Sequence, residues 1–149
     1  MQQDWSIKQV DFSNAFVQAT LDKDVHVAMP PMFQDNTSPF EQCLKLNKSL
    51  HGMVDSPRHW WMHVQQGLID LGFKPSETDP GIYFGRGMIL MLHVDDLLAT
   101  GPDATKIEGL FTDLEKAGFA LTREETGDDV FHFLGTELNM EEELSLIHI

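Results

Sequence analysis

The amino-acid sequence predicts an α+β fold in which two helices pack on one face of an antiparallel sheet. The apolar run 88–99 is interrupted by Asp95 and Asp96 and has glycines on both sides. This pattern is typical of two buried strands joined by a tight turn. Amphipathic patterns at 57–71 and 103–117 indicate two helices. Two helices against one sheet face form a stable layered arrangement.

The first part of the chain is read mainly as strands. Residues 7–12 alternate in polarity and predict a strand that ends near Asp11. A short strand is expected at 25–29, followed by a proline-rich loop at 30–39 and a further strand at 44–46. These segments lead into the first helix.

That helix is expected over 57–71, with Ser56 as its N-cap and Pro57 in the first helical position. Gly72 provides the stop signal. Both tryptophans are expected in the core, because the apolar residues at helical spacing are Trp60, Trp61, Val64, Leu68 and Leu71.

The second half continues with a strand at 81–84, the Asp95 hairpin and a helix over 103–117 that Gly118 ends. One face of this helix carries Ile107, Leu110, Phe111 and Leu114, so this face should pack on the sheet. Strands are expected at 119–122 and 131–138, on either side of an acidic turn.

The adjacent acids Asp95 and Asp96 are candidates for a metal-binding site. A carboxylate in an apolar hairpin is costly unless a cation or a hydrogen-bond donor meets it. Asp11 ends the upstream strand, and together with Asp95 and Asp96 it could converge at one site. Two magnesium ions between such carboxylates activate a hydroxyl and stabilise the leaving oxygen in phosphoryl displacement. The alternative is an ordinary hydrated turn or helix cap.

Composition and charge limit the function. The chain has 149 residues, 42% of them hydrophobic, which suits one compact domain, 1–143. Its formal charge of -14 argues against an autonomous nucleic-acid binder, because Lys and Arg supply most non-specific affinity for phosphate. The acidity is uneven. Six Lys or Arg face eight acids through Pro75, whereas four face sixteen from Ser76 onward.

Four motifs and a weaker fifth occur in one order along the chain. They are QVDFSNAF at 9–16, CLKLNKSLHGMVDSPRHW at 43–60, LGFKPSETDPGIY at 71–83, LHVDDLLATG at 92–101 and FLGTE at 133–137. Together they resemble the reverse transcriptase domain of copia-type LTR retrotransposons, over nearly the whole chain. The resemblance implies a polymerase palm-like sheet and the activity of an RNA-directed DNA polymerase.

The resemblance assigns the acidic residues. Asp11 and Asp95 become metal-bridging catalytic carboxylates, Asp96 supports them, and the backbone carbonyl of Phe12 is a further metal ligand. The implied cofactor is a pair of Mg²⁺ ions, with Mn²⁺ as an alternative. The reaction is two-metal nucleotidyl transfer from a dNTP to a primer 3′-hydroxyl.

The resemblance also implies nucleotide-binding residues. The ring of Phe16 would lie under the sugar of the incoming nucleotide and exclude a 2′-hydroxyl, whereas without the family context it reads as a core phenylalanine. Gly52, Ser56 and Pro57 match the loop beneath the template base and nucleotide, where glycine permits close backbone approach. The interpretation of Ser56 and Pro57 as the start of a helix is compatible with this role.

Departures from the family pattern occur near the chemistry. His93 and His51 replace usual tyrosines, and Met53, Val54 and Asp55 replace the usual Leu-Lys-Gln. A lost lysine and a gained acid should weaken binding of a polyanion, whereas a neutral His93 could still form a hydrogen bond. Two alternatives stay open. One is a degenerate or domesticated non-catalytic remnant of the same fold, and the other is a metal-dependent nuclease or phosphatase that uses the same acids.

By the same resemblance, the chain is a palm fragment of a Pol polyprotein that lacks the start of the fingers, the thumb and RNase H, and it is expected to be inactive alone. Its partners in the parent are an RNA template, a DNA primer and dNTPs. The expected location is intracellular, in a cytoplasmic retrotransposon particle with a possible nuclear stage. No signal peptide or membrane span is apparent.

Three smaller features complete the sequence. Cys43 is expected to be a partly buried small hydrophobe in a reducing compartment. His59 and His63 have helical ligand spacing, but without a nearby Cys or acid no zinc site is expected. Residues 144–149 match what one reading frame of a sequencing adapter would encode, so we expect a non-native tail, with a short edge strand as the alternative.

Overall fold

The computed structural model describes residues 5–33, 43–123, 130–134, 136–139 and 145–148. Within them, six antiparallel strands form the main sheet in the order β4-β5-β6-β7-β1-β8. The strands are β1 (Ser6–Phe12), β4 (Lys74–Pro75), β5 (Ile82–Gly85), β6 (Met88–His93), β7 (Asp96–Gly101) and β8 (Leu121–Arg123). The predicted hairpin around Asp95 is confirmed as β6 and β7, whereas the two-residue strand β4 was not predicted.

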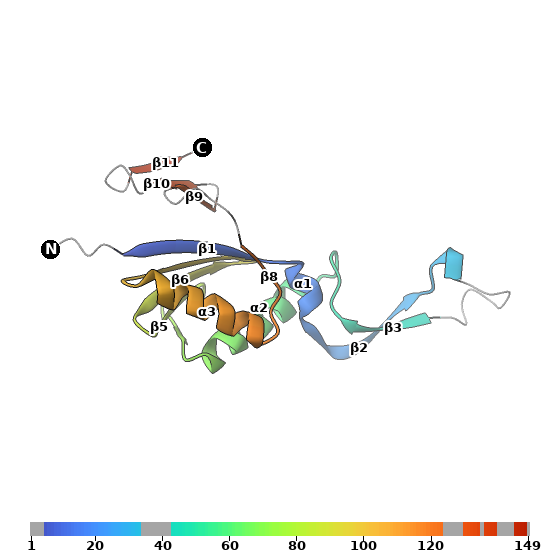
Figure 1. Cartoon of the computed structure of the whole chain (residues 1–149). Helices are drawn as coiled ribbons and strands as arrows, with labels where there is room; N and C mark the ends of the chain where they lie inside the picture. The colour runs from blue at the N-terminus through green and yellow to red at the C-terminus, as the bar shows by residue number, and fades with distance from the viewer. Residues whose placement is uncertain (1–4, 34–42, 124–129, 135, 140–144, 149) are drawn as a thin grey trace.

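Two long helices, α2 (Ser56–Asp70) and α3 (Ala104–Lys116), cover one face of this sheet (Figure 1). The predicted α+β arrangement is thus confirmed. A third helix, α1 (Ala15–Gln18), was missed. It spans four residues, which is too short for a 3.6-residue period to show in the sequence.

The boundaries of α3 follow from local signals. The carboxylate of Asp103 accepts a hydrogen bond from the backbone N–H of Thr105 at 2.9 Å, so it caps the first turn. After the last turn, Gly118 has a φ of +98°, a left-handed conformation that glycine adopts without strain. The four predicted core residues are all buried: Ile107, Leu110, Phe111 and Leu114.

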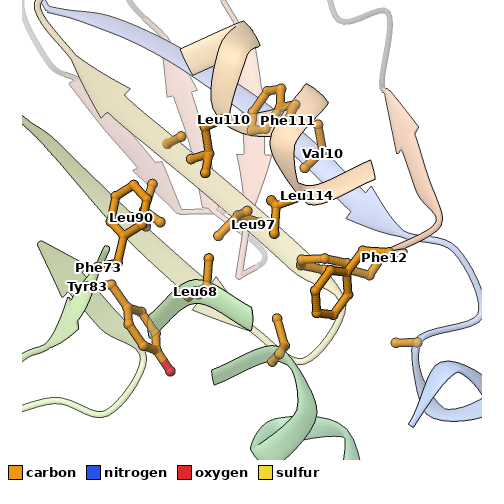
Figure 2. Close-up of a cluster of buried hydrophobic side chains, with 14 of the residues drawn as sticks. Val10, Phe12, Leu68, Phe73, Tyr83, Leu90, Leu97, Leu110, Phe111 and Leu114 are labelled. Atoms are coloured by element: carbon orange, nitrogen blue, oxygen red, sulfur yellow. The ribbon is translucent and has the colours of Figure 1, made fainter. Parts of the chain in front are cut away.

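The main core lies between the sheet and the two helices. Figure 2 shows Val10 and Leu97 on the sheet facing Leu110 and Leu114 of α3. Val10 pairs directly with Leu97 across the strands, and directly opposed residues share one face of an antiparallel sheet. Gln9 and Asp11 alternate with Val10 along β1, so they lie on the other face. The strand therefore separates apolar packing from its acidic residue.

That other face is covered in part by a second sheet of order β11-β10-β9. Its strands are β9 (Val130–Phe133), β10 (Thr136–Asn139) and β11 (Ser145–His148). Phe133 is buried against Leu98, with Ile7 and Met91 packed around them. The single strand predicted at 131–138 was wrong, because the chain turns back after β9 near Leu134, where φ is 54°. The non-native origin of residues 144–149 stays a prediction.

A two-stranded ribbon, β2 (Thr20–Ala28) with β3 (Cys43–Lys48), extends away from the main sheet (Figure 1). Strand β2 is longer than the predicted segment at 25–29, and a short 3₁₀ helix, η1 (Pro31–Phe33), lies in the predicted loop. Cys43 is exposed, so its predicted partial burial was wrong. In a two-stranded ribbon, many side chains have no layer that could cover them. None of the described helices is long and apolar enough to cross a membrane.

Candidate active site

The site begins with a row of side chains across four strands. Asp11 on β1 pairs directly with Asp96 on β7 and with Thr122 on β8, and Asp96 pairs with His93 on β6. Direct pairing places all four residues on one face of the sheet, the face opposite α2 and α3. The tertiary fold thus brings together two of the three predicted catalytic acids.

Asp95 lies beside this row, in the turn between β6 and β7. Its carbonyl oxygen accepts a hydrogen bond of 2.7 Å from the backbone N–H of Phe12, the residue after Asp11. The pairing of His93 with Asp96 leaves a two-residue turn made of Val94 and Asp95. The backbone therefore gathers Asp11, Phe12, Asp95 and Asp96 at one end of the sheet, as the sequence predicted.

Asp96 has a perturbed environment. Partial burial raises the pKa of its carboxyl above the usual value of 3.8, and the negative charge of Asp95 raises it further. A hydrogen bond from Gln9 and the nearby His93 act in the opposite direction. A carboxylate that is partly desolvated beside a second acid is one that a cation would stabilise.

The carboxylates are adjacent without forming a complete metal cage. Among the described residues, no three His, Cys, Asp or Glu side chains gather around a point where they could hold an ion. Mg²⁺ is usually bound through one or two carboxylates together with substrate phosphates, and so does not need an all-protein cage.

The predicted nucleotide-binding residues lie around the same turn. Phe16 lies in α1, five residues after Asp11, and its ring meets that of His51 edge to face, with centroids 5.4 Å apart. Phe16 and Pro57 line a small pocket of about 130 Å³, together with Trp60, Trp61, Val64, Leu92 and Val94. Gly52 has a φ of +88°, with open space where a Cβ would lie. The structure thus brings Phe16, His51 and Pro57 next to the turn that carries Asp95.

The start of α2 corrects one prediction. Asp55, not Ser56, occupies the N-cap position, and its side chain makes no capping hydrogen bond. The buried hydroxyl of Ser56 donates instead to the carbonyl of Leu50 at 2.6 Å. Ser56 was a reasonable cap by sequence, but the fold of the preceding loop places the Leu50 carbonyl within its reach, so Ser56 anchors that loop to the helix.

The added acid at position 55 is neutralised locally. Its carboxylate forms an ion pair with Lys23 on β2, which lowers the pKa of Asp55 and raises that of Lys23. One turn later, the buried His59 contacts Asp22 through Nε2 at 2.8 Å. These contacts tie α2 to the ribbon, and they place the ammonium group of Lys23 beside the added carboxylate of Asp55.

Two further residues at the site were not predicted. Gln9 contacts Asp96 from the neighbouring strand. The indole N–H of Trp60 donates to the backbone carbonyl of Val94 in the turn that carries Asp95. Trp60 is buried as predicted, but Trp61 is 40% exposed, so its predicted core position was wrong. Neighbouring helical residues point about 100° apart, and only one of the two can face the sheet. Gln9 could have been identified from the sequence, because it is polar and lies two positions before Asp11, on the same face of the predicted strand.

The family model described as reverse transcriptase (RNA-dependent DNA polymerase) matches residues 1–148. The chain belongs to this reverse transcriptase family. Members of the family use divalent metal ions, in keeping with a site built on carboxylates. The resemblance seen in the motifs is thereby confirmed.

Curated relatives of this reverse transcriptase domain are retrotransposon polyproteins. It is 36% identical over 137 residues to the retrovirus-related Pol polyprotein from transposon RE1 of Arabidopsis thaliana. The matched region covers 89% of the chain and 9% of that polyprotein. The corresponding polyprotein from transposon RE2 is 35% identical over the same length and shares. That from transposon TNT 1-94 of Nicotiana tabacum is 33% identical over 119 residues, 76% of the chain and 9% of the relative. The reverse transcriptase chain thus spans about a tenth of each relative's length.

Proposed function

We propose that this chain forms the catalytic palm of an RNA-directed DNA polymerase within a copia-type Pol polyprotein. The observation that carries the proposal is the direct pairing of Asp11 with Asp96, next to a turn that presents Asp95. The substrates in the parent would be dNTPs, an RNA template and a DNA primer. On its own, the chain of 149 residues should not extend a primer, because its charge of -14 leaves little basic surface for nucleic acid.

The residues at the site fit a pair of magnesium ions. Asp11 and Asp95 would hold the ions, with Asp96 in support and the carbonyl of Phe12 as a further oxygen ligand; Mn²⁺ could take the same place. Hard oxygen donors are what Mg²⁺ prefers. When bound, the ions would lower the charge barrier to attack by the primer 3′-hydroxyl and stabilise the leaving oxygen.

The protein's own groups would organise the reactants. The strand pairing fixes the positions of Asp11 and Asp96, while the Phe12 N–H fixes the peptide that carries Asp95. Phe16, His51 and Pro57 would border the incoming nucleotide on one side of the turn. Gly52 and Ser56 shape the same loop, and His93 extends the row beside Asp96.

Primer extension tests this function. The complete parent polyprotein should extend a primer on an RNA template when Mg²⁺ is present. Asp95→Asn should abolish extension, because it removes a charge on which the metal site depends. Asp70→Asn at the exposed end of α2 is the matched control and should retain activity. Extension that survives Asp95→Asn would refute the catalytic assignment.

A second candidate is a degenerate or domesticated remnant that keeps the fold without catalysis. The observation that favours it is His93, which lies directly opposite Asp96 where the resembled family has a tyrosine. The same assay separates the two functions. A complete and folded parent that shows no extension with Mg²⁺ or Mn²⁺ would support the remnant.

A further inference from the structure

The turn that carries the catalytic acids contains an unfavourable backbone conformation. Val94 has a φ of +54°, in the left-handed region that β-branched residues rarely adopt. Such a conformation is strained and persists only where its surroundings hold it. Because Val94 directly precedes Asp95 and Asp96, whatever holds its conformation also sets the direction of both carboxylates.

Both carbonyl groups of the turn are held from outside the hairpin. The carbonyl of Asp95 accepts from the backbone N–H of Phe12. That of Val94 accepts from the indole N–H of Trp60 on α2. The two donors also support each other, since the rings of Phe12 and Trp60 pack edge to face with centroids 5.1 Å apart. The peptide units of the turn are therefore fixed by β1 and by α2.

Packing alone does not hold Val94 in place. Its side chain is 45% exposed, and the small pocket of about 130 Å³ beside it leaves free space between the turn and α2. Trp60, in contrast, is 1% exposed and also packs against Phe119. Trp60 is therefore fixed in place by the core, and its indole N–H donates a hydrogen bond from α2 to the turn.

We propose that Trp60 is a positioning residue for catalysis, whose indole N–H holds the Val94 peptide and thereby aims Asp95 and Asp96. This inference rests on the proposed polymerase function of the same site. It assigns Trp60 a role beyond core packing, because the bond ends on the backbone of the catalytic turn. Met62, also on α2, is 46% exposed and lies outside the pocket beside the turn, so Met62→Leu serves as the control.

Pre-steady-state extension by the complete parent separates positioning from folding. Trp60→Phe keeps an aromatic ring but removes the donor, and it should slow the burst of extension about threefold to tenfold, the range expected for one lost hydrogen bond. The burst amplitude, which counts folded active sites, should stay unchanged. Met62→Leu should change neither quantity. A lower amplitude with an unchanged rate would show a structural role and overturn the proposal.

A second variant guards against a folding defect in Trp60→Phe. Replacing Trp60 by 3-benzothienylalanine exchanges the indole N–H for sulfur and retains the ring shape. It should slow the burst to the same extent as Trp60→Phe. A burst rate equal to that of the unaltered parent would mean that the N–H does not position the turn.

Metal binding provides a readout that does not need catalysis. Titration of the parent with Mn²⁺ alone should show several-fold weaker binding after Trp60→Phe and unchanged binding after Met62→Leu. If the unaltered parent binds Mn²⁺ but extends no primer, the polymerase function fails while the role of Trp60 is still decided by this titration. Equal Mn²⁺ affinity in the parent and Trp60→Phe would overturn the positioning role.

Discussion

Asp11 and Asp96 face each other across β1 and β7, on the side of the sheet that the helices leave uncovered. Each alternates along its strand with an apolar residue, Val10 or Leu97, that enters the main core. One register therefore sets both the packing of the fold and the approach of the two acids. Because a shift of one residue would turn each strand over, the core protects the geometry of the site.

The raised pKa of Asp96 predicts that its charged carboxylate destabilises the folded chain at neutral pH. Since burial and Asp95 raise this pKa in the folded chain, folding favours the protonated carboxyl. The free energy that this preference adds to the folded chain is fully present below the unfolded pKa near 3.8, and it is lost as pH rises through the higher folded pKa. Asp96→Asn should therefore raise the thermal midpoint at pH 7 in the presence of a chelator. The gain should vanish below about pH 4.

Asp113 serves as a control, because its pKa is shifted in the opposite direction. Its pKa is lowered by a hydrogen bond from Arg86, so its carboxylate adds stability above the unfolded pKa that is lost as pH falls through the folded one. Asp113→Asn should lower the thermal midpoint at pH 7. A pH-independent effect of Asp96→Asn would contradict the assigned environment of Asp96.

Two helix glycines should respond oppositely to alanine. In α3, a Cβ at Gly109 would meet open space, so Gly109→Ala should stabilise the chain by about 0.5–1 kcal/mol through helix propensity. In α2, a Cβ at Gly67 would lie 2.5 Å from the ring of Phe119. That ring is buried among other aromatic rings, so Gly67→Ala should destabilise by about 1–3 kcal/mol. Urea unfolding of both variants measures the difference. Equal stabilisation would mean that Phe119 moves aside freely.

Phe16 should control the choice of sugar in an active parent. Its ring contacts His51 and lines the pocket beside the turn of Val94 and Asp95. Phe16→Val shortens the side chain there and should admit ribonucleotides more readily, measured as the ratio of kcat/KM for dNTP and rNTP. Phe84→Val on the exposed side of β5 is the control and should leave this ratio unchanged. Unchanged discrimination in Phe16→Val would leave Phe16 as a residue of the core.

The parts of the fold that the sequence predicted depend on local patterns. Helix α3 has an apolar stripe and a final Gly118, and both appear in the structure as expected, while Asp103 at the start of the predicted range is its N-cap. The hairpin of β6 and β7 follows in the same way from an apolar run with a polar turn. Such signals arise from interactions within a few residues, so one sequence is enough to read them.

The errors occur where distant groups compete for a residue. Ser56 donates to the Leu50 carbonyl rather than capping α2, and Asp55 takes the N-cap position while pairing with Lys23. Trp61 lies in the same helical pattern as Trp60 but turns away from the core. Nothing within a few residues of these positions reports which partner is nearest in space.

The sequence by itself determined the fold class, the helices and hairpin, the family, and which acids were candidates for catalysis, because period, capping and motif order are local properties of the chain. Only the tertiary structure decided that Asp11 lies opposite Asp96, that Gln9 reaches Asp96, and that Trp60 rather than Trp61 holds the turn. These relationships depend on strand register and helix rotation. Both are fixed by the burial of apolar side chains far apart in the sequence.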